Sequence, residues 1–354
     1  MFDYLQHWYR RHFSDPQVVI LALVLLVGFT VAVLASHLLA PLIASAILAY
    51  LLEGAVRVLT RYGMPRLPAV LLVFCLFLSL FILTMLLLIP LLAGQLGQFA
   101  RELPAIVSRL QEVALHLPEN YPQIFSDQQV ADLLDSLRHS VTNFGQRILV
   151  LSLTSAVQLL TLLVYFVLVP LLVFFMLKDK ESILAWFLRF LPRERSLVND
   201  VWADVEAGIG NYVRGKFIEI LIVWSVSLVV FVILDLPYAL LLSLVVGLSV
   251  IVPYVGAAIA TIPVAAVAYF EFGLNAPFWY VLVAYGIIQF LDGNVLVPLL
   301  FSEVVNLHPV AIITAVLLFG GLWGIWGVFF AIPLATLIAA VLRAWPAPPE
   351  HEIQ

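Results

Sequence analysis

The acidic residues of the C-terminal half are the side chains best suited to chemistry in this sequence. Five acids occur between Phe217 and Leu342, a stretch without lysine or arginine: Glu219, Asp235, Glu271, Asp292 and Glu303. A carboxylate in an apolar, base-free stretch can bind a cation, exchange a proton or accept hydrogen bonds from a polar solute. These properties suit the transport of ions or small solutes.

Asp292 is the strongest candidate because an apolar run precedes it. Residues 281–291 contain no charged side chain. A carboxylate within such a span is costly unless it is paired, protonated or hydrated. Gln289 lies one helical turn earlier, and Gly293 would let the helix unwind before Asn294, so these groups and freed carbonyls would form a polar site. Alternatively, Asp292 caps a short helix at the membrane edge.

The other four acids have simpler explanations. Glu219 follows Lys216 by one helical turn, so it either forms a surface ion pair or adds to the polar site. Asp235, Glu271 and Glu303 adjoin turns or loops, where water would solvate them.

Motifs of nucleotide hydrolysis and metal catalysis are absent from the sequence. The seven histidines are dispersed without a His-Glu-x-x-His motif, and no Gly-x-x-x-x-Gly-Lys-Ser/Thr loop occurs. The single cysteine, Cys75, lies in an apolar run, so neither a disulfide framework nor a cysteine-based metal site is expected. We expect no enzymatic activity, no cofactor and no metal.

The composition indicates that these residues lie in a membrane protein. Hydrophobic residues make up 64% and charged residues 11% of the 354 residues, against about 45–50% and about 25% in soluble domains. The net charge of −5 also argues against nucleic-acid binding. We predict an all-α polytopic membrane protein with about eight transmembrane segments.

Five apolar runs are predicted to span the bilayer, since a crossing needs about 20 residues. They are Val18–Ala35, Leu38–Leu52, Leu67–Leu92, Ile148–Leu177 and Phe217–Leu234. A sixth span, Phe278–Pro298, is predicted between two longer apolar stretches that are described below. Most basic residues, including Arg10, Arg11 and Arg343, then fall on one side, which places both termini in the cytoplasm.

The segment between the third and fourth spans is predicted to form a helical periplasmic arm. Apolar residues three or four apart form one stripe from Leu96 to Leu117 and a second from Val130 to Ile148. Pro104 would kink or restart the first helix. The two helices would pack on each other, or part of the stripe would contact a neighbouring subunit.

Two further apolar stretches, Tyr238–Phe270 and Pro309–Leu342, are long for one crossing and short for two. Each would form a re-entrant hairpin, and because they follow spans of opposite direction they would form an inverted repeat. The alternative is eight ordinary spans, two of them kinked. The predicted helix breaks are Pro253, Gly256, Pro263, Gly293, Pro298, Gly324 and Gly327.

The predicted organisation has six parts. An amphipathic helix from Val198 to Tyr212 leads into the fifth span, or is a simple linker. The parts are N-terminal spans (1–92), the extracytoplasmic arm (93–147), the fourth span (148–177), a cytoplasmic amphipathic segment (178–216), a transport domain (217–342) and a cytoplasmic tail (343–354).

An ordered series of motifs connects the sequence to a known family. The series includes Asn211-Tyr-Val-Arg-Gly215, Ile251-Val-Pro-Tyr-Val-Gly256, Gln289-Phe-Leu-Asp-Gly-Asn-Val-Leu-Val-Pro298 and Gly324-Ile-Trp-Gly327. It resembles the autoinducer-2 exporter family of bacterial inner-membrane proteins, in its PerM-type permease branch. The resemblance implies a homo-oligomeric inner-membrane transporter, with relatives tied to autoinducer-2 export or to sodium/proton antiport.

Three functions follow from these observations. The leading hypothesis is a secondary transporter that exports a small polar solute by alternating access, with Asp292, Gln289, Asn294 and Glu219 at its site. The alternative is a sodium(cation)/proton antiporter, because five acids occur without a base. A non-transporting scaffold is the third. The expected partners are the solute, protons or sodium, the lipid bilayer and further copies of the chain, and not nucleic acid.

Overall fold

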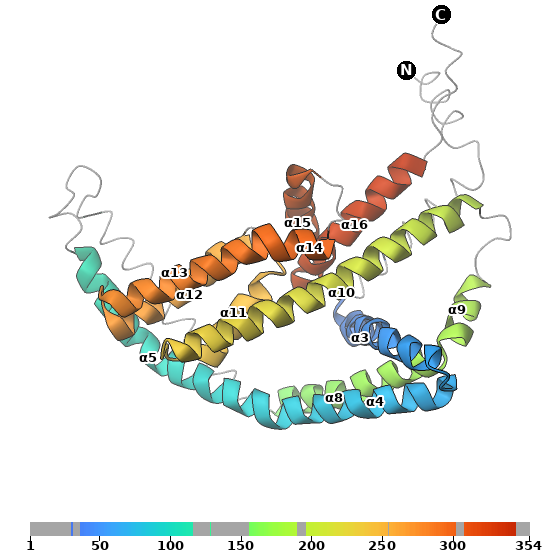
Figure 1. Cartoon of the computed structure of the whole chain (residues 1–354), viewed down its shortest axis with the longest axis horizontal. Coiled ribbons are helices and arrows are strands. Elements are labelled where there is room, and N and C mark those ends of the chain that lie inside the picture. Colours follow the sequence, from blue (N-terminus) through green and yellow to red (C-terminus); the bar gives the residue numbers. More distant parts are fainter. Residues whose placement is uncertain are drawn as a thin grey trace, which may run out of the picture. The chain divides into compact units, whose positions relative to one another are not determined.

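The computed structural model describes residues 30, 36–115, 128, 156–189, 196–253, 255–301 and 308–344 (Figure 1). Within these ranges the regular secondary structure is entirely helical, which confirms the all-α prediction. The first predicted span, apart from Thr30, and the second arm helix lie outside the described residues.

The helices of the N-terminal half overlap the second to fifth predicted spans. They are α3 (Ser36–Arg61), α4 (Arg66–Leu83), the π-helical turn η1 (Thr84–Leu88), α5 (Ile89–Leu115), α8 (Ala156–Lys178), α9 (Lys180–Leu188) and α10 (Ser196–Ile233). The predicted amphipathic helix and the fifth span form one helix, since α10 is 38 residues long.

The C-terminal half is divided into shorter helices. They are α11 (Ala239–Ser249), α12 (Val255–Phe272), α13 (Ala276–Leu291), the π-helical turn η2 (Asp292–Leu296), α14 (Val297–Phe301), α15 (Pro309–Trp323) and α16 (Ile325–Ala344).

Five helical stretches of the described chain are long and apolar enough to cross a bilayer. They are Leu39–Arg61, Arg66–Ile106, Gly208–Ile233, Val255–Phe272 and Ala276–Phe301. Four shorter apolar helices accompany them in the same part of the chain: Val164–Lys178, Ala239–Ser249, Val310–Trp323 and Ile325–Val341. The protein is therefore a multi-pass membrane protein.

The third predicted span and the first arm helix are continuous through α4, η1 and α5. Pro104 lies inside α5 and does not restart it. The ring of Pro104 removes one backbone donor, and the hydroxyl of Ser108 donates to the Pro104 carbonyl at 2.9 Å. The first arm helix is thus an extension of a span.

The base of the arm packs on its own chain at the turn before α11. The Leu241 N–H donates to Gln95 Oε1 at 2.9 Å, and the rings of Phe99 and Tyr238 lie 5.5 Å apart. Burial raises the pKa of Tyr238, and its hydrogen bond to the Glu102 carboxylate raises it further. Part of the first stripe therefore contacts the turn between α10 and α11, a partner that the sequence did not predict.

The chain forms two compact units. The first comprises Met1–Cys75, Tyr165–Phe217 and Leu299–Gln354, and the second Leu76–Val164 and Ile218–Pro298. The core of the second unit is formed by α10, α11, α12 and α13, which bury apolar side chains against one another. In the first unit, α3 meets α8 where Ser45 Oγ donates to the Val169 carbonyl at 3.3 Å.

Both long apolar stretches fold into a pair of helices that pack against each other. The second pair turns at Gly324, whose φ of +60° favours glycine. A Cβ at Gly327 would meet the carbonyl of Phe319, and one at Gly256 would meet that of Ser249 in the first pair. This arrangement favours hairpins over kinked single helices, whereas their re-entry into the membrane and the inverted repeat stay predictions.

The predicted helix breaks have different outcomes. Pro253 lies between α11 and α12, and Gly324 lies between α15 and α16. Pro263 lies inside α12, so the predicted break there is wrong. Pro298 is the second residue of α14, which follows η2 directly in a helix that continues to Phe301, so the predicted break there is wrong.

Candidate functional site

The predicted polar site lies on α13 and the π-helical turn that follows it. Asp292 opens η2, and the Val297 N–H donates to the Asp292 carbonyl five residues earlier. The helix then continues to Phe301, so Gly293 widens the helix and does not end it. π-Helical turns occur frequently at functional sites because they change the backbone hydrogen-bonding pattern locally.

Gln289 and Asp292 both have shielded side-chain atoms on this helix, whereas Asn294 is exposed. The side-chain nitrogen Nε2 of Gln289 and the oxygen Oδ1 of Asp292 are shielded from the surface. Asn294 is exposed, and its Nδ2 donates to the Phe290 carbonyl at 2.9 Å. The inward-facing pair therefore consists of Gln289 and Asp292.

Tyr285 connects this helix to the first hairpin. Its hydroxyl donates to the Ala257 carbonyl at 2.7 Å, and the Thr261 hydroxyl donates to the Tyr285 oxygen at 3.3 Å. Ala257 lies in the first turn of α12, directly after the break that contains Pro253. The helix that holds Asp292 is thus fixed to the hairpin at its break, a connection that the sequence did not predict.

Glu219 is buried, contrary to the surface-pair interpretation. Its exposed fraction is 1%, and that of Lys216 is 4%. The ammonium of Lys216 lies 5.1 Å from the ring centroid of Phe301 and 6.0 Å from that of Tyr212. Cations are stabilised over aromatic faces at such distances. A role for Glu219 in the polar site stays a prediction.

The acids assigned to turns have the expected surroundings where the structure describes them. Asp235 and Glu271 are exposed, which confirms that they need no buried partner. Asp235 also adopts a φ of +52°, in a turn before α11. Glu303 lies outside the described residues.

A second polar centre surrounds Glu53 in the first unit. Glu53 is 5% exposed, and three cations contact its carboxylate. The two terminal nitrogens of Arg66 lie 3.3 and 3.4 Å from its two oxygens. Lys180 Nζ lies 3.3 Å and Arg57 Nε 3.7 Å from Oε1. We call Glu53, Arg57, Arg66 and Lys180 the Glu53 cluster.

The Glu53 cluster holds four helices together at the end of the spans. Arg66 also donates to the Leu177 carbonyl at 3.2 Å, so a side chain of α4 binds both α3 and α8. Lys180 brings the start of α9 to the same carboxylate. The sequence offered one signal, the spacing of four residues between Glu53 and Arg57, but it assigned the basic residues only to membrane topology.

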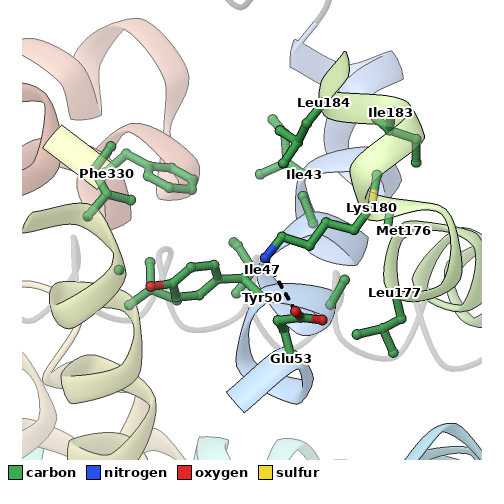
Figure 2. Close-up of a pocket in the computed structure, with 15 residues that line it drawn as sticks. Ile43, Ile47, Tyr50, Glu53, Met176, Leu177, Lys180, Ile183, Leu184 and Phe330 are labelled. Carbon is green, nitrogen blue, oxygen red and sulfur yellow. Dashed lines mark hydrogen bonds and ion pairs between the residues drawn. The ribbon is translucent and has the colours of Figure 1, made fainter. Parts of the chain in front are cut away.

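A cavity of about 510 Å³ lies beside the Glu53 cluster. Figure 2 shows Lys180 reaching across it to Glu53, with apolar side chains of α3, α8 and α9 around them. Arg214 donates to the Tyr50 hydroxyl at 2.8 Å. Gly210 lies so close to Tyr50 that a Cβ there would collide with the phenol. Glycine at 210 therefore lets α10 approach the Tyr50 ring.

Metal chemistry finds no support in the part of the chain that the structure describes. No three His, Cys, Asp or Glu side chains there lie close enough to hold a metal ion. The single cysteine, Cys75, is exposed.

Comparison with known protein families identifies the family of this chain. A model of the AI-2E family transporters matches residues 19–347. The chain belongs to the AI-2E transporter family. The resemblance found in the sequence motifs is thereby confirmed.

Relatives of this AI-2E family member carry names of transport proteins. The chain is 45% identical to "Putative permease PerM" of Escherichia coli (strain K12), with 98% of each chain covered. It is 26% identical to "Putative transport protein YueF" of Bacillus subtilis (strain 168), covering 94% of this chain and 92% of that one. It is 23% identical to "AI-2 transport protein TqsA" of Escherichia coli (strain K12), covering 91% and 92%. The AI-2E family member described here is therefore a membrane transport protein.

Proposed function

We propose that this transporter moves a small polar solute out of the bacterial cytoplasm by alternating access. The observation that carries the proposal is the π-helical turn at Asp292, inside the apolar stretch Ala276–Phe301. The shielded side-chain atoms of Gln289 and Asp292 support a binding site at this turn. Asp292 Oδ1 can accept a hydrogen bond from a solute or pair with a positive charge, and Gln289 Nε2 can donate a hydrogen bond.

The energetic cost of Asp292 supports a functional role. A carboxylate within the hydrocarbon region costs at least about 2.5–3.5 kcal/mol on insertion scales, so such residues usually mark substrate or ion pathways. The surrounding stretch from Phe217 to Leu342 contains no lysine or arginine. A transported cation, proton or polar solute would interact with the Asp292 carboxylate during each cycle.

The connection from α13 to the first hairpin suggests how binding would drive a conformational change. Tyr285 lies one turn before Gln289 and holds the first turn of α12 through the Ala257 carbonyl. The break between α11 and α12 is where the backbone can most readily pivot, because Pro253 has no backbone N–H and the regular helix is interrupted there. Binding of a solute at Asp292 would change the conformation of the first hairpin through the Tyr285 hydrogen bond.

A cation/proton antiporter is the second candidate. It is favoured by the five acids that occur without a base between Phe217 and Leu342. Such an antiporter would use Asp292 alternately for a proton and for sodium, and it would need no organic solute.

The membrane and the assembly are also part of the proposal. We place the protein in the bacterial inner membrane as a homo-oligomer with both termini in the cytoplasm. The support is the excess of basic residues on one side of the spans, including Arg57, Arg61 and Arg66.

Flux into proteoliposomes tests the proposal. The wild-type protein and the variants Asp292→Asn and Asp235→Asn are reconstituted, and proton and sodium gradients are imposed separately. We expect Asp292→Asn to lose transport and Asp235→Asn to keep it, because Asp235 is exposed in a turn. Proton-driven sodium flux without an organic solute would favour the antiporter. Wild-type flux in Asp292→Asn would refute both functions.

A further inference from the structure

The cavity of the first unit is apolar along its wall and charged at one end. Its volume of about 510 Å³ lies within the range of about 300–1,000 Å³ that is typical of small-molecule sites. The polar side chains among its lining residues are Tyr50, Glu53 and Lys180. Figure 2 shows these three on the same side of the apolar residues Ile43 and Leu184. A ligand that fits must therefore be largely apolar with a polar end.

The Glu53 cluster, which contributes Glu53 and Lys180 to the charged end, carries an excess of positive charge. One carboxylate, Glu53, is shared by the three cations of the Glu53 cluster. The side chains of Arg57, Arg66 and Lys180 are 48%, 37% and 33% exposed, so they are accessible to an approaching anion. Since an arginine offers five N–H donors and a lysine three, the cluster has donors beyond those that Glu53 uses. A ligand that complements the charge at this end therefore carries an acidic group.

The Glu53 cluster lies where membrane-spanning helices end. The span Leu39–Arg61 ends just after Arg57, the next span begins at Arg66, and the apolar helix Val164–Lys178 ends just before Lys180. Helix ends of this kind lie at the level of lipid head groups. Basic pockets between transmembrane helices at this level bind acidic lipid head groups.

We propose that the cavity binds an anionic phospholipid of the surrounding bilayer. An acyl chain occupies the space between Ile43, Ile47 and Leu184, and the phosphate lies against Lys180, the cation among the lining residues. The wall excludes a small polar solute, which would find hydrogen-bond partners at one end only. This lipid site belongs to the first unit and is independent of the transport role assigned to Asp292 in the second unit.

The proposal predicts opposite effects for two substitutions in the Glu53 cluster. Lys180→Gln removes a cation from the phosphate position and weakens lipid binding several-fold. Glu53→Gln removes the carboxylate that competes with the phosphate for the same donors, so it strengthens binding. A merely structural role of the cluster predicts weaker binding in both variants, since each loses an ion pair.

Ala46→Trp tests the acyl-chain position without changing any charge. Ala46 lines the cavity and is itself exposed, so a larger side chain fills the space without overpacking the interior. Leu76→Trp is the matched control, because Leu76 is 68% exposed and is absent from the cavity lining.

Photolabelling of the full-length protein in phosphatidylethanolamine vesicles measures binding. The vesicles contain either phosphatidylglycerol or phosphatidylcholine with the same photoactivatable acyl chain, and labelled peptides are located by mass spectrometry. We expect the phosphatidylglycerol probe to label the α3 and α9 peptides several-fold more than the phosphatidylcholine probe. Labelling falls in Ala46→Trp and Lys180→Gln, rises in Glu53→Gln and is unchanged in Leu76→Trp.

Three results would overturn the proposal. Equal labelling of these peptides by both probes would show that charge plays no part. Unchanged labelling in Ala46→Trp would place the acyl chain elsewhere. Displacement of the probe by decanoate at lower concentration than by unlabelled phosphatidylglycerol would assign the cavity to a free amphiphile and not to a bilayer lipid.

Discussion

The Glu53 cluster and the turn at Asp292 each hold a carboxylate among apolar helices, but the surroundings of the two carboxylates differ. Glu53 is 5% exposed and has Arg57, Arg66 and Lys180 within 4 Å of its oxygens. Asp292 lies in a stretch without lysine or arginine and opens a π-helical turn. Glu53 has cations that are fixed in the fold, whereas Asp292 is proposed to interact with a transported partner that binds and leaves.

The largest effect on folding is expected when Glu53 loses its cations. In Arg66→Gln/Lys180→Gln the buried carboxylate keeps only Arg57, which is half exposed and 3.7 Å away. Leaving a buried charge without its partners costs about 3–5 kcal/mol. The thermal midpoint in detergent should fall markedly. Arg61→Gln, at an exposed position of α3 outside the cluster, is the control.

A triple variant separates the charge from the packing in this prediction. Adding Glu53→Gln to Arg66→Gln/Lys180→Gln removes the buried charge, so most of the lost stability should return. A double variant as stable as the wild type would show that Glu53 does not need its cations.

The close contact inside the second hairpin should produce the next largest effect. In Gly327→Ala the new Cβ would meet the Phe319 carbonyl, and relief of this overlap costs about 1–3 kcal/mol. Gly321→Ala is the matched control, because no heavy atom lies within 4 Å of its Cβ position. It should gain up to about 1 kcal/mol from helix propensity. Equal thermal midpoints for the two variants would contradict the close packing at this turn.

The link between α13 and the first hairpin should have a moderate effect. Tyr285→Phe removes the hydroxyl that bonds the Ala257 carbonyl and receives Thr261. The stability should fall by about 0.5–1.5 kcal/mol, and flux should fall with it if the hairpin moves with α13. Tyr280→Phe, at a position that is 62% exposed, controls for loss of a phenol. Flux in Tyr285→Phe equal to that in Tyr280→Phe would remove Tyr285 from the transport pathway.

Arg57 should contribute least to the Glu53 cluster. Its side chain is 48% exposed, and its nitrogen lies 3.7 Å from Glu53 Oε1. Exposed ion pairs contribute about 0–1 kcal/mol, so Arg57→Gln should barely change the thermal midpoint. A fall in the thermal midpoint as large as that caused by Arg66→Gln would mean that Arg57 holds the Glu53 carboxylate directly.

Local patterns predicted much of the fold. The apolar runs predicted the described spans, because a bilayer demands long uninterrupted stretches. The Pro253 and Gly324 breaks were visible as interruptions in such runs, and both hairpins turn there. The break predicted at Pro263 was wrong because a proline inside a helix can remove one backbone donor without ending the helix. The continuity of α10 could have been found, since no proline separates Tyr212 from Phe217.

The candidate site was only partly visible in the sequence for a physical reason. Gln289 and Asp292 share one helical turn, so spacing alone brought them together. The Glu53 cluster joins residues 13 and 127 positions apart. Such pairing depends on which helices pack together, and a single sequence carries no signal for it. Asn294 could not be placed either, because the π-helical turn changes the face on which it lies.

The most direct test of the difference between the two carboxylates is the flux per folded molecule of Asp292→Asn. The folded fraction and the thermal midpoint are measured on the same preparation. We predict that flux falls to the level of empty vesicles while the midpoint stays at the wild-type value. Wild-type flux, or a midpoint as low as that of Arg66→Gln/Lys180→Gln, would contradict a transport role for Asp292.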